Sequence, residues 1–461
     1  MTWSRLYSLK SYIRSSLGTI PILALLVSWV LTRLFEHLGG WMVSQGFYDL
    51  KYGFLALSAT EAHAFLDRIF TITLTCLVFA FGSLLVAIQV AGGQYTPRII
   101  ATTLLRDNVI RCIVGLFVFT ALWANRTMVQ LGQGDLLVPQ FQVFLGALFG
   151  FASLIAFIVL IGYCAKLLRP VSLVRRVAKQ GIAVIESVYP YPTQDVYAPP
   201  VPTKKRKLGL LSWGSRDSAA VPAPAAKRGP PDRVIYHQGR SAIVLAVNLQ
   251  RLVAEAQRAD TVIEFVPQVG DFVAGDEPLF YLYGNTGAIN DRMLRSLVAF
   301  GSERTMEQDP MFSFRIEVDI ALKALSPAIN DPTTAVLAID MLHRLLRLVG
   351  NRSLRGHEIR DDAGQPRVIF RTPNWEDFVH ITFREIRFCG VGSLQIPRRL
   401  RAMIENLLQT LPKHRHPALH EELELLDRAL EREHLFPEDL ALARIADSQG
   451  MGGSSGTSAH N

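Results

Sequence analysis

The stretch ALSPAINDPTTA, residues 324–335, holds the densest cluster of side chains in this sequence that could do chemistry. Hydroxyl, amide and carboxylate groups gather there at Ser326, Asn330, Asp331, Thr333 and Thr334. A helix that begins beside them offers unpaired backbone N–H groups and the positive end of its dipole, which favour an anion or a polar head group. These five residues are therefore our candidate ligand or interface corner.

The prolines of the same stretch give it a purely structural interpretation as well. A helix over 312–325 should end at Ser326, because Pro327 disfavours the helical conformation in the residue before it. Asp331 is placed to cap the next helix, with Pro332 at the first helical position, where a missing N–H costs nothing. Three interpretations stay open: a tight corner between helices, a site for a polar ligand, and a contact with another chain or with the membrane domain.

No other cluster predicts a catalytic or metal site. His414, His416 and His420 lie close together, but a proline interrupts the run, and we interpret it as a solvated basic loop. Glu317 and Asp319 are two residues apart and do not share a helix face. Phosphate-binding loops, serine-nucleophile elbows and zinc-protease motifs do not occur in the sequence. We predict no catalytic residue, no metal and no cofactor, and an enzyme is the least favoured class.

The elements that position the corner follow two halves of different composition. Residues 17–165 are very poor in charge, and four apolar spans can be recognised there, each close to the length that crosses a hydrocarbon core of about 30 Å. The third span is the weakest, because Arg111 and Arg126 leave a short uncharged centre. The four spans are 17–35, 69–90, 109–128 and 141–164.

Lysine and arginine in the connecting segments predict the orientation of the spans. Basic residues precede the first span, separate the second from the third and follow the fourth, whereas the opposite segments hold few. By the positive-inside rule, both termini are cytoplasmic, and the protein is a multi-pass protein of the cell (inner) membrane. The net charge of +8 then reflects an anionic lipid surface and not nucleic acid. The expected partners are the lipid bilayer and, if four helices per chain are too few to enclose a pore, further copies of the chain.

The spans carry two local signals. Ser58 and Glu61 form the ends of a capping box, which predicts a helix that begins before the second span and runs into it without a break. Gly146 and Gly150 form a small-xxx-small step in the fourth span, which favours close packing within the chain over a dimer face.

Polar residues of the second span could line a pathway, although threonine and serine also bond back to their own helix. These residues are Thr71, Thr73, Thr75, Ser83 and Gln89.

The segment that follows the second span is a second candidate site. Gly92 and Gly93 loosen the helix and Pro97 restricts the chain, while Arg98 is placed to meet a lipid phosphate. We predict a lipid contact there, and alternatively a hinge between the membrane and cytoplasmic domains.

The second half predicts a cytoplasmic α+β domain in which a small sheet is followed by helices. Strands are expected at 241–247, 261–266 and 278–284, with Asn248 capping a helix through Gln257. Further helices are expected at about 288–300, 312–325, 332–349, 375–388, 398–411, 417–434 and 437–447. The predicted organisation is a cytoplasmic segment 1–16, a four-helix transmembrane domain 17–188, a disordered Pro/Ala/Lys-rich linker 189–232, the α+β domain 233–447 and a disordered tail 448–461.

Three stretches resemble the DUF2254 family of bacterial membrane proteins: IQVAGGQYTPRII at 88–100, VGDFVAGDEPL at 269–279 and GSERTMEQDPMFSFRIEVDIALKALSPAINDPTTA at 301–335. The second is also similar to the Gly-Asp hairpins of biotinyl and lipoyl carrier domains, but the modified lysine is absent, so we interpret it as shared turn geometry. The family resemblance implies membrane location and a cytoplasmic C-terminal domain, and it implies no activity.

Two functions remain in view. The first is a channel or transporter with a cytoplasmic regulatory domain, and the alternative is a non-catalytic membrane-anchored sensor or scaffold that binds a polar ligand or a protein partner.

Overall fold

A computed structural model describes the chain as two compact units, each of which is treated by itself below. The apolar helical unit comprises residues 12–173, and the C-terminal unit comprises residues 1–11 and 174–461. The residues described are 3–4, 6–7, 13, 16, 18–44, 57–94, 107–132, 140–167, 169–193, 229–354, 358–361 and 363–452.

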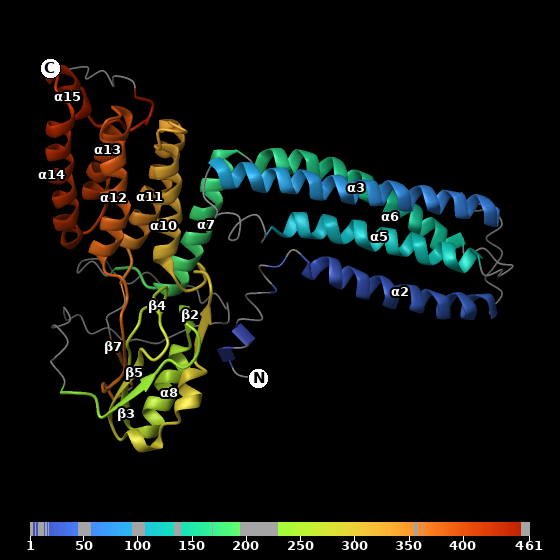
Figure 1. The fold of residues 1–461 in the computed structure, drawn as a ribbon, viewed down its shortest axis with the longest axis horizontal. Helices are drawn as coiled ribbons and strands as arrows, with labels where there is room; N and C mark the ends of the chain where they lie inside the picture. The colour runs from blue at the N-terminus through green and yellow to red at the C-terminus, as the bar shows by residue number, and fades with distance from the viewer. Residues whose placement is uncertain are drawn as a thin grey trace. The chain divides into compact units, whose positions relative to one another are not determined.

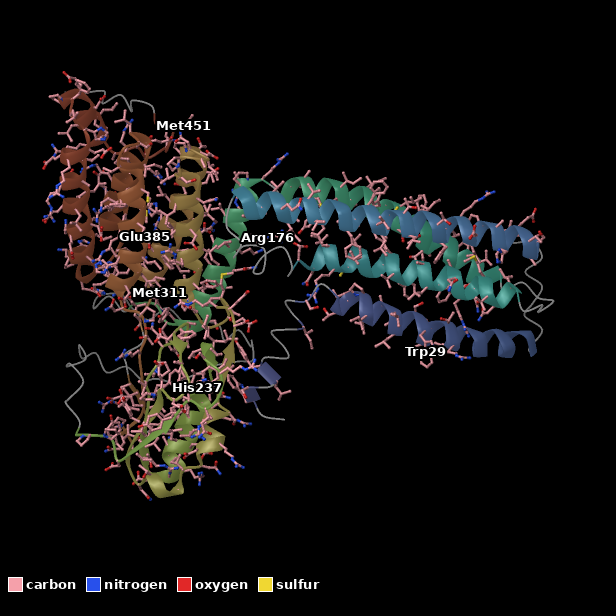
Figure 2. All side chains as sticks on the ribbon, viewed as in Figure 1. Trp29, Arg176, His237, Met311, Glu385 and Met451 are labelled. Carbon is pink, nitrogen blue, oxygen red and sulfur yellow. The ribbon has the colours of Figure 1, made fainter. Side chains whose placement is uncertain are left out.

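The apolar helical unit consists of long helices that pack side by side (Figure 1). Helix α5 packs against its three neighbours, and α3 also packs against α6. Leu66, Phe117 and Trp123 are buried between the helices, whereas apolar side chains such as Trp29 project outward (Figure 2). An exposed apolar surface of this kind is typical of helices surrounded by lipid. The helices are α2 (Thr19–Ser44), α3 (Ala59–Gln94), α5 (Asn108–Gly132) and α6 (Gln140–Leu167).

Three of the four predicted spans are confirmed as helices that are long and apolar enough to cross a membrane: Ala59–Gly93, Asn108–Leu131 and Phe141–Leu167. The first predicted span lies in α2, where the described apolar stretch, Thr19–Leu34, is shorter than a full crossing. The described residues therefore support three membrane-capable helices and not four.

The two local signals in the spans are confirmed. The backbone N–H of Ser58 donates to the Glu61 carboxylate at 2.9 Å and the N–H of Glu61 donates to Ser58 Oγ at 3.3 Å, so α3 begins with a capping box and continues through the second span. A Cβ on Gly146 would lie 2.8 Å from Leu66 of α3, and one on Gly150 would lie 2.9 Å from Ile69. The small-xxx-small step therefore packs within the chain.

The C-terminal unit contains two sheets. The larger sheet has the strand order β1-β5-β3-β8-β7, with β3 and β8 parallel and the other pairs antiparallel, and the smaller antiparallel sheet has the order β4-β2-β6. The helix α8 (Leu249–Ala259) packs against β3 and β8 and buries Leu252, Val253 and Ala256. The strands are β1 (Arg233–Tyr236), β2 (Ala242–Val247), β3 (Thr261–Phe265), β4 (Phe272–Val273), β5 (Pro278–Gly284), β6 (Val298–Gly301), β7 (Glu358–Arg360) and β8 (Pro366–Phe370).

Most of the remaining helices of this unit lie alongside one another in a bundle next to the sheets (Figure 1). Their shared core is apolar and includes Phe314, Leu345 and Phe378. The helices are α7 (Pro170–Val188), η2 (Thr286–Ala288), α9 (Asp291–Arg295), α10 (Pro310–Ala324), α11 (Pro332–Gly350), α12 (Trp375–Gly390), α13 (Gln395–Thr410), η3 (Lys413–Arg415), α14 (His416–Glu433) and α15 (Pro437–Ala443).

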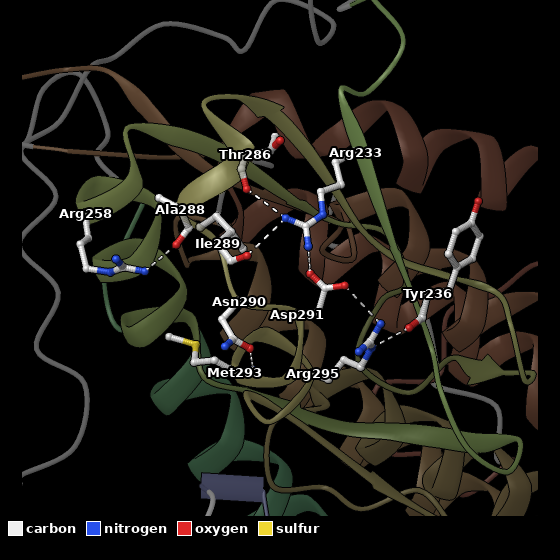
Figure 3. A network of polar contacts seen from close by, with 10 residues as sticks. All are labelled: Arg233, Tyr236, Arg258, Thr286, Ala288, Ile289, Asn290, Asp291, Met293 and Arg295. Atoms are coloured by element: carbon white, nitrogen blue, oxygen red, sulfur yellow. Dashed lines mark hydrogen bonds and ion pairs between the residues drawn. The ribbon is translucent and has the colours of Figure 1, made fainter.

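A polar network fastens the edge strand β1 to the segment that contains α9 (Figure 3). The Arg233 guanidinium pairs with Asp291 and donates to the carbonyl of Thr286 at 3.0 Å. Arg295 pairs with the same Asp291 at 3.5 Å and donates to the carbonyl of Tyr236 at 3.0 Å. The network satisfies backbone carbonyls that the irregular segment would otherwise leave without donors.

The structure also differs from the sequence-based expectations at other places, among them the following. The helix expected over 288–300 is only α9, and the residues after it form β6, because pairing with β2 satisfies their backbone groups. Residues 189–193, assigned to the linker, are packed: Tyr189 is buried and the N–H of Thr193 donates to the Asn351 carbonyl at 2.9 Å. Residues 174–188, assigned to the transmembrane domain, are grouped with the C-terminal unit.

Candidate functional site

The predicted corner between α10 and α11 has the expected backbone structure. Asp331 is the N-cap of α11, since its Oδ1 accepts from the N–H of Thr334 at 3.0 Å, and Pro332 occupies the first turn. The hydroxyl of Thr334 donates to the other carboxylate oxygen at 2.5 Å. Both carboxylate oxygens of Asp331 are thus engaged within the corner itself.

The remaining residues of the corner complete the turn. Ser326 donates to the Lys323 carbonyl at 2.7 Å, and its own carbonyl accepts from the N–H of Asn330 at 2.9 Å. Asn330 has a positive φ of 47°, a conformation that asparagine tolerates better than most residues. Thr333 is exposed. The structure thus brings the five predicted residues together in one turn, and their binding role stays a prediction.

The second predicted site is only partly described. Gly92 and Gly93 are still helical in the last turn of α3, and Pro97 and Arg98 lie outside the described residues. The predicted hinge and lipid contact therefore stay predictions.

The C-terminal unit holds a cavity of about 180 Å³ where the strands β3 and β8 end and the helices α8 and α10 begin. Sites at the carboxyl ends of parallel strands commonly bind ligands, because loops and helix starts converge there. The cavity is lined by Trp3, Ser187, Val188, Tyr189, Val247, Asn248, Leu249, Gln250, Phe265, Gln268, Val269, Gln308, Asp309, Pro310, Phe370, Arg371, Thr372 and Pro373.

Asp309 is the buried acid of this cavity, with 5% of its surface exposed. It caps α10, because its Oδ1 accepts from the N–H of Phe312 at 3.1 Å. Burial and, to a smaller extent, Asp271 raise the pKa of Asp309 from 3.8 to about 6, against the opposing effects of Arg304 and of the helix N–H groups. Desolvation disfavours the charged form more than these partners stabilise it.

Gly270 brings the loop before β4 into contact with Asp309. The residue has a φ of +95°, and a Cβ on it would lie 2.5 Å from Oδ2 of Asp309. The Arg304 Nε donates to the Gly270 carbonyl at 2.8 Å and so holds the same loop. A glycine is required here both by the backbone conformation and by the close approach.

Amide side chains fix the rest of the polar wall. Gln308 Oε1 accepts from the backbone N–H of Val247 at 3.0 Å, which joins the segment before α10 to β2. Asn248 caps α8 by accepting from the N–H of Arg251 at 3.1 Å, as predicted. These contacts fix the segment before α10 and the start of α8 at the wall of the cavity.

The N-terminal segment contributes the aromatic residue Trp3. The backbone N–H of Ser4 donates to the Ser296 carbonyl at 3.2 Å, and the Trp3 and Tyr7 rings lie 5.3 Å apart. Both rings pack on a small apolar cluster that contains Leu245 and Ala299. Trp3 thereby lines the cavity from the segment that precedes α2 in the chain.

The described lining of the cavity offers hydroxyl groups, amides and a carboxyl group. Its hydroxyl groups belong to Ser187, Thr372 and Tyr189, and no His, Cys or Lys is found among the described lining residues that could act as a base or nucleophile. Arg371 is exposed at the wall. The arrangement can hold a small molecule between aromatic faces, amides and one carboxyl group.

A second buried acid lies outside the cavity. Glu317 of α10 is fully buried, and no hydrogen bond from the described residues reaches its carboxylate oxygens. Burial raises its pKa well above the ordinary value, and the nearby backbone N–H of Ala178 lowers it by less. Asp319 instead pairs with Arg315 at 2.6 Å, so these two acids do not act together.

The polar residues of the second span are distributed over the surface of α3. Thr71, Thr75, Ser83 and Gln89 are exposed, whereas Thr73 is buried. The Thr75 hydroxyl donates to the Thr71 carbonyl at 2.8 Å. This bond back to the helix's own backbone is the expected alternative to lining a pathway. A larger hollow of about 450 Å³ between α5 and α6 is almost wholly apolar, as expected for a groove that accommodates lipid.

The cavity itself was missed in the sequence. Two segments near the cavity are VGD at 269–271 and the QDP step at 308–310, whose local patterns indicate only turn geometry and a family resemblance. A usable signal was present, because QDP repeats the Asp-Pro step of the predicted corner and marks a second capped helix. That both segments meet at one cavity could not be derived from local patterns.

Comparisons with other protein sequences indicate a membrane protein, as the long apolar helices do. The sequence profile of the family described as "Predicted membrane protein (DUF2254)" matches residues 14–406, which confirms the resemblance. Uncharacterized proteins of Mycobacterium bovis and Mycobacterium tuberculosis are each 24% identical over 380 residues, covering 80% of this chain and 68% of the relative. No solved structure matches the chain significantly.

Proposed function

We propose that this chain, which belongs to the DUF2254 family of predicted membrane proteins, is a membrane-anchored sensor that binds a small ligand in its C-terminal unit. The observation that carries the proposal is the cavity of about 180 Å³ with the buried Asp309 in its wall. A concave site lined by aromatic and apolar side chains, with a few convergent polar groups, is the usual form of a small-molecule site.

The connections of the cavity suit a sensor. Trp3 belongs to the segment directly before α2, and Tyr189 follows directly after α7 in the chain. The N-terminal segment leads into the apolar helix α2, and α7 follows the apolar helix α6 in the chain. A ligand that changes the packing at Trp3 or Tyr189 therefore acts on a segment that is connected to one of these helices. A sensor needs two states of these segments, and a ligand shifts the equilibrium between the states only by the difference in its affinity for them.

In the proposed membrane arrangement, α2 is a fourth span beside the three helices of sufficient length. Both termini and the C-terminal unit then lie in the cytoplasm, and the spans lie in the cell membrane, in accordance with the basic residues beside the spans.

The proposal is tested by filling the cavity. Ligand screening on the purified full-length chain in nanodiscs should find a compound that raises the unfolding temperature, because a ligand that binds only the folded state stabilises it. Gln268→Trp adds a large side chain to the cavity wall and should abolish that rise. Gln257→Trp makes the same change at an exposed position of α8 and should leave it intact. Equal responses of the two variants would place the ligand elsewhere.

A channel or transporter is the second candidate, and it is favoured by the exposed polar face of α3. Thr71, Thr75 and Gln89 are exposed on α3 and not enclosed within the helical unit, so a pathway that they line would have to form between copies of the chain. Cysteines at these positions should react with a water-soluble thiol reagent, whereas cysteines at the exposed apolar positions Ile72 and Leu74 should be protected by lipid. Uniform protection, together with no ion flux through proteoliposomes, would exclude the channel.

A further inference from the structure

We infer that the cavity binds a small organic cation, an ammonium group with apolar substituents, at the carboxylate of Asp309. This inference rests on the proposed function, because it names the chemical class of ligand for the same site. The argument uses the charge of the cavity, its aromatic walls and its size.

The carboxyl group of Asp309 is the first observation. It is almost wholly buried, and among the described residues it forms a hydrogen bond with the backbone N–H of Phe312 but no ion pair. Arg304 contributes a favourable charge from a greater distance, and its Nε is committed to the Gly270 carbonyl. Arg304 faces the same Gly270 position as the carboxylate but makes no ion pair with it, so a cation bound in direct contact would further stabilise this buried charge.

Aromatic side chains are the second observation. Trp3, Tyr189, Phe265 and Phe370 all line the cavity, so aromatic residues enter it from four separate segments. The faces of aromatic rings attract cations, and most strongly when the site is shielded from water. A quaternary or alkylated ammonium is the cation that uses such walls best, because it combines a positive charge with apolar surface.

The size of the cavity is the third observation. Its volume of about 180 Å³ corresponds to about six water molecules at the density of the liquid. That space suits an ammonium compound of the size of tetramethylammonium or a little larger.

An anion is the competing class. Arg371 lines the cavity and α8 begins there, and both would favour negative charge. However, Arg371 is exposed, whereas the buried charge is that of Asp309, and Asp271 adds a second carboxylate nearby. Desolvated charges count for more than exposed ones, so the interior of the cavity favours a cation.

The charged groups around Asp309 predict how binding depends on pH. Arg304 and Arg371 add positive charge near the site, and Asp271 adds negative charge beside it. Because the pKa of Asp309 is raised to about 6, the carboxylate that attracts the ligand is lost as the pH falls below that value. Affinity should therefore weaken by about tenfold for each pH unit below about 6, as one proton competes with the ligand.

The test measures binding of tetramethylammonium chloride to the full-length chain in nanodiscs, by calorimetry and by tryptophan fluorescence, with sodium chloride as the ionic-strength control. Binding at pH 7.5 should be at least tenfold weaker in Asp309→Asn, which removes the charge and keeps a side chain able to cap α10. Asp377→Asn makes the same change at a carboxylate in the capping box of α12, outside the cavity lining, and should bind like the unmodified protein.

Three results would overturn the inference: no binding of tetramethylammonium, equal binding by both variants, or tighter binding at pH 5 than at pH 7.5. The last comparison uses the unmodified protein, so it decides the question even if Asp309→Asn fails to fold. If acetate or inorganic phosphate binds instead and Gln268→Trp abolishes that binding, the cavity is a ligand site for anions and the proposed function stands. If no ligand is sensitive to Gln268→Trp, the proposed function fails as well.

Discussion

Gly270 and Asp309 are in direct contact, so close that a Cβ on Gly270 would lie 2.5 Å from Oδ2 of the aspartate. The contact joins the loop between β3 and β4 to the start of α10, two segments that are far apart in the sequence. It limits the room around the buried acid of the cavity. The properties of this pair lead to the first two predictions.

Gly270→Ala should destabilise the C-terminal unit by about 1–3 kcal/mol, because an added Cβ meets both an unfavourable φ and the Asp309 carboxylate. The free energy of unfolding can be measured with denaturant on the full-length protein. Gly364→Ala is the control, since Gly364 also has a positive φ but has nothing within 4 Å of its Cβ position. Equal losses in the two variants would mean that strain, and not the contact with Asp309, explains the effect.

The stability of the protein should fall as the pH rises from about 4 to about 6, in part because of Asp309. A carboxyl group whose pKa is raised on folding binds more protons in the folded state than in the unfolded state over this range, so the free energy of unfolding decreases with pH. The rise from 3.8 to about 6 corresponds to a change of at most about 3 kcal/mol. The difference between the unmodified protein and Asp309→Asn isolates this contribution, because Glu317 titrates in both. A difference that does not vary between pH 4 and pH 7 would contradict the raised pKa.

Asp331→Ala should cost about 0.5–2 kcal/mol, the usual loss when an N-cap is removed, while Asp331→Asn should cost only a few tenths. Asp331 accepts from the backbone N–H and the hydroxyl of Thr334, and alanine would leave both without this acceptor. Thermal unfolding of the two variants checks the expectation. If a ligand or partner is found whose binding is lost in Asp331→Asn at unchanged stability, the corner is a binding site as well as a cap.

Gly146→Val should weaken the packing of α6 on α3, because even a Cβ at this position would lie 2.8 Å from Leu66, and valine adds two methyl groups. The unfolding temperature in detergent should fall by several degrees relative to the unmodified protein. Gly162→Val serves as the control, since Gly162 belongs to the same helix and has nothing within 4 Å of its Cβ position. A larger loss in the control would show that intrinsic helix propensity, and not packing on α3, decides the outcome.

Local chemistry predicted much of the fold. The capping box at Ser58, the N-caps Asn248 and Asp331, and the helices that become α10 to α14 follow from residues within one or two turns of each other. The prediction of a helix over 288–300 was wrong, because a distant segment determines the structure there. Its second half pairs with β2 across more than fifty residues, and such pairing is decided by a partner strand and not by the local pattern.

The sequence by itself determined that this is a predicted membrane protein with a large C-terminal unit of strands and helices, because long uncharged runs, basic flanking segments and caps act over short distances along the chain. Only the tertiary structure revealed the cavity. The pKa of Asp309, the position of Trp3 and the burial of Glu317 depend on groups brought together from distant segments. Desolvation is a property of the packed interior, and the order of the residues does not specify it.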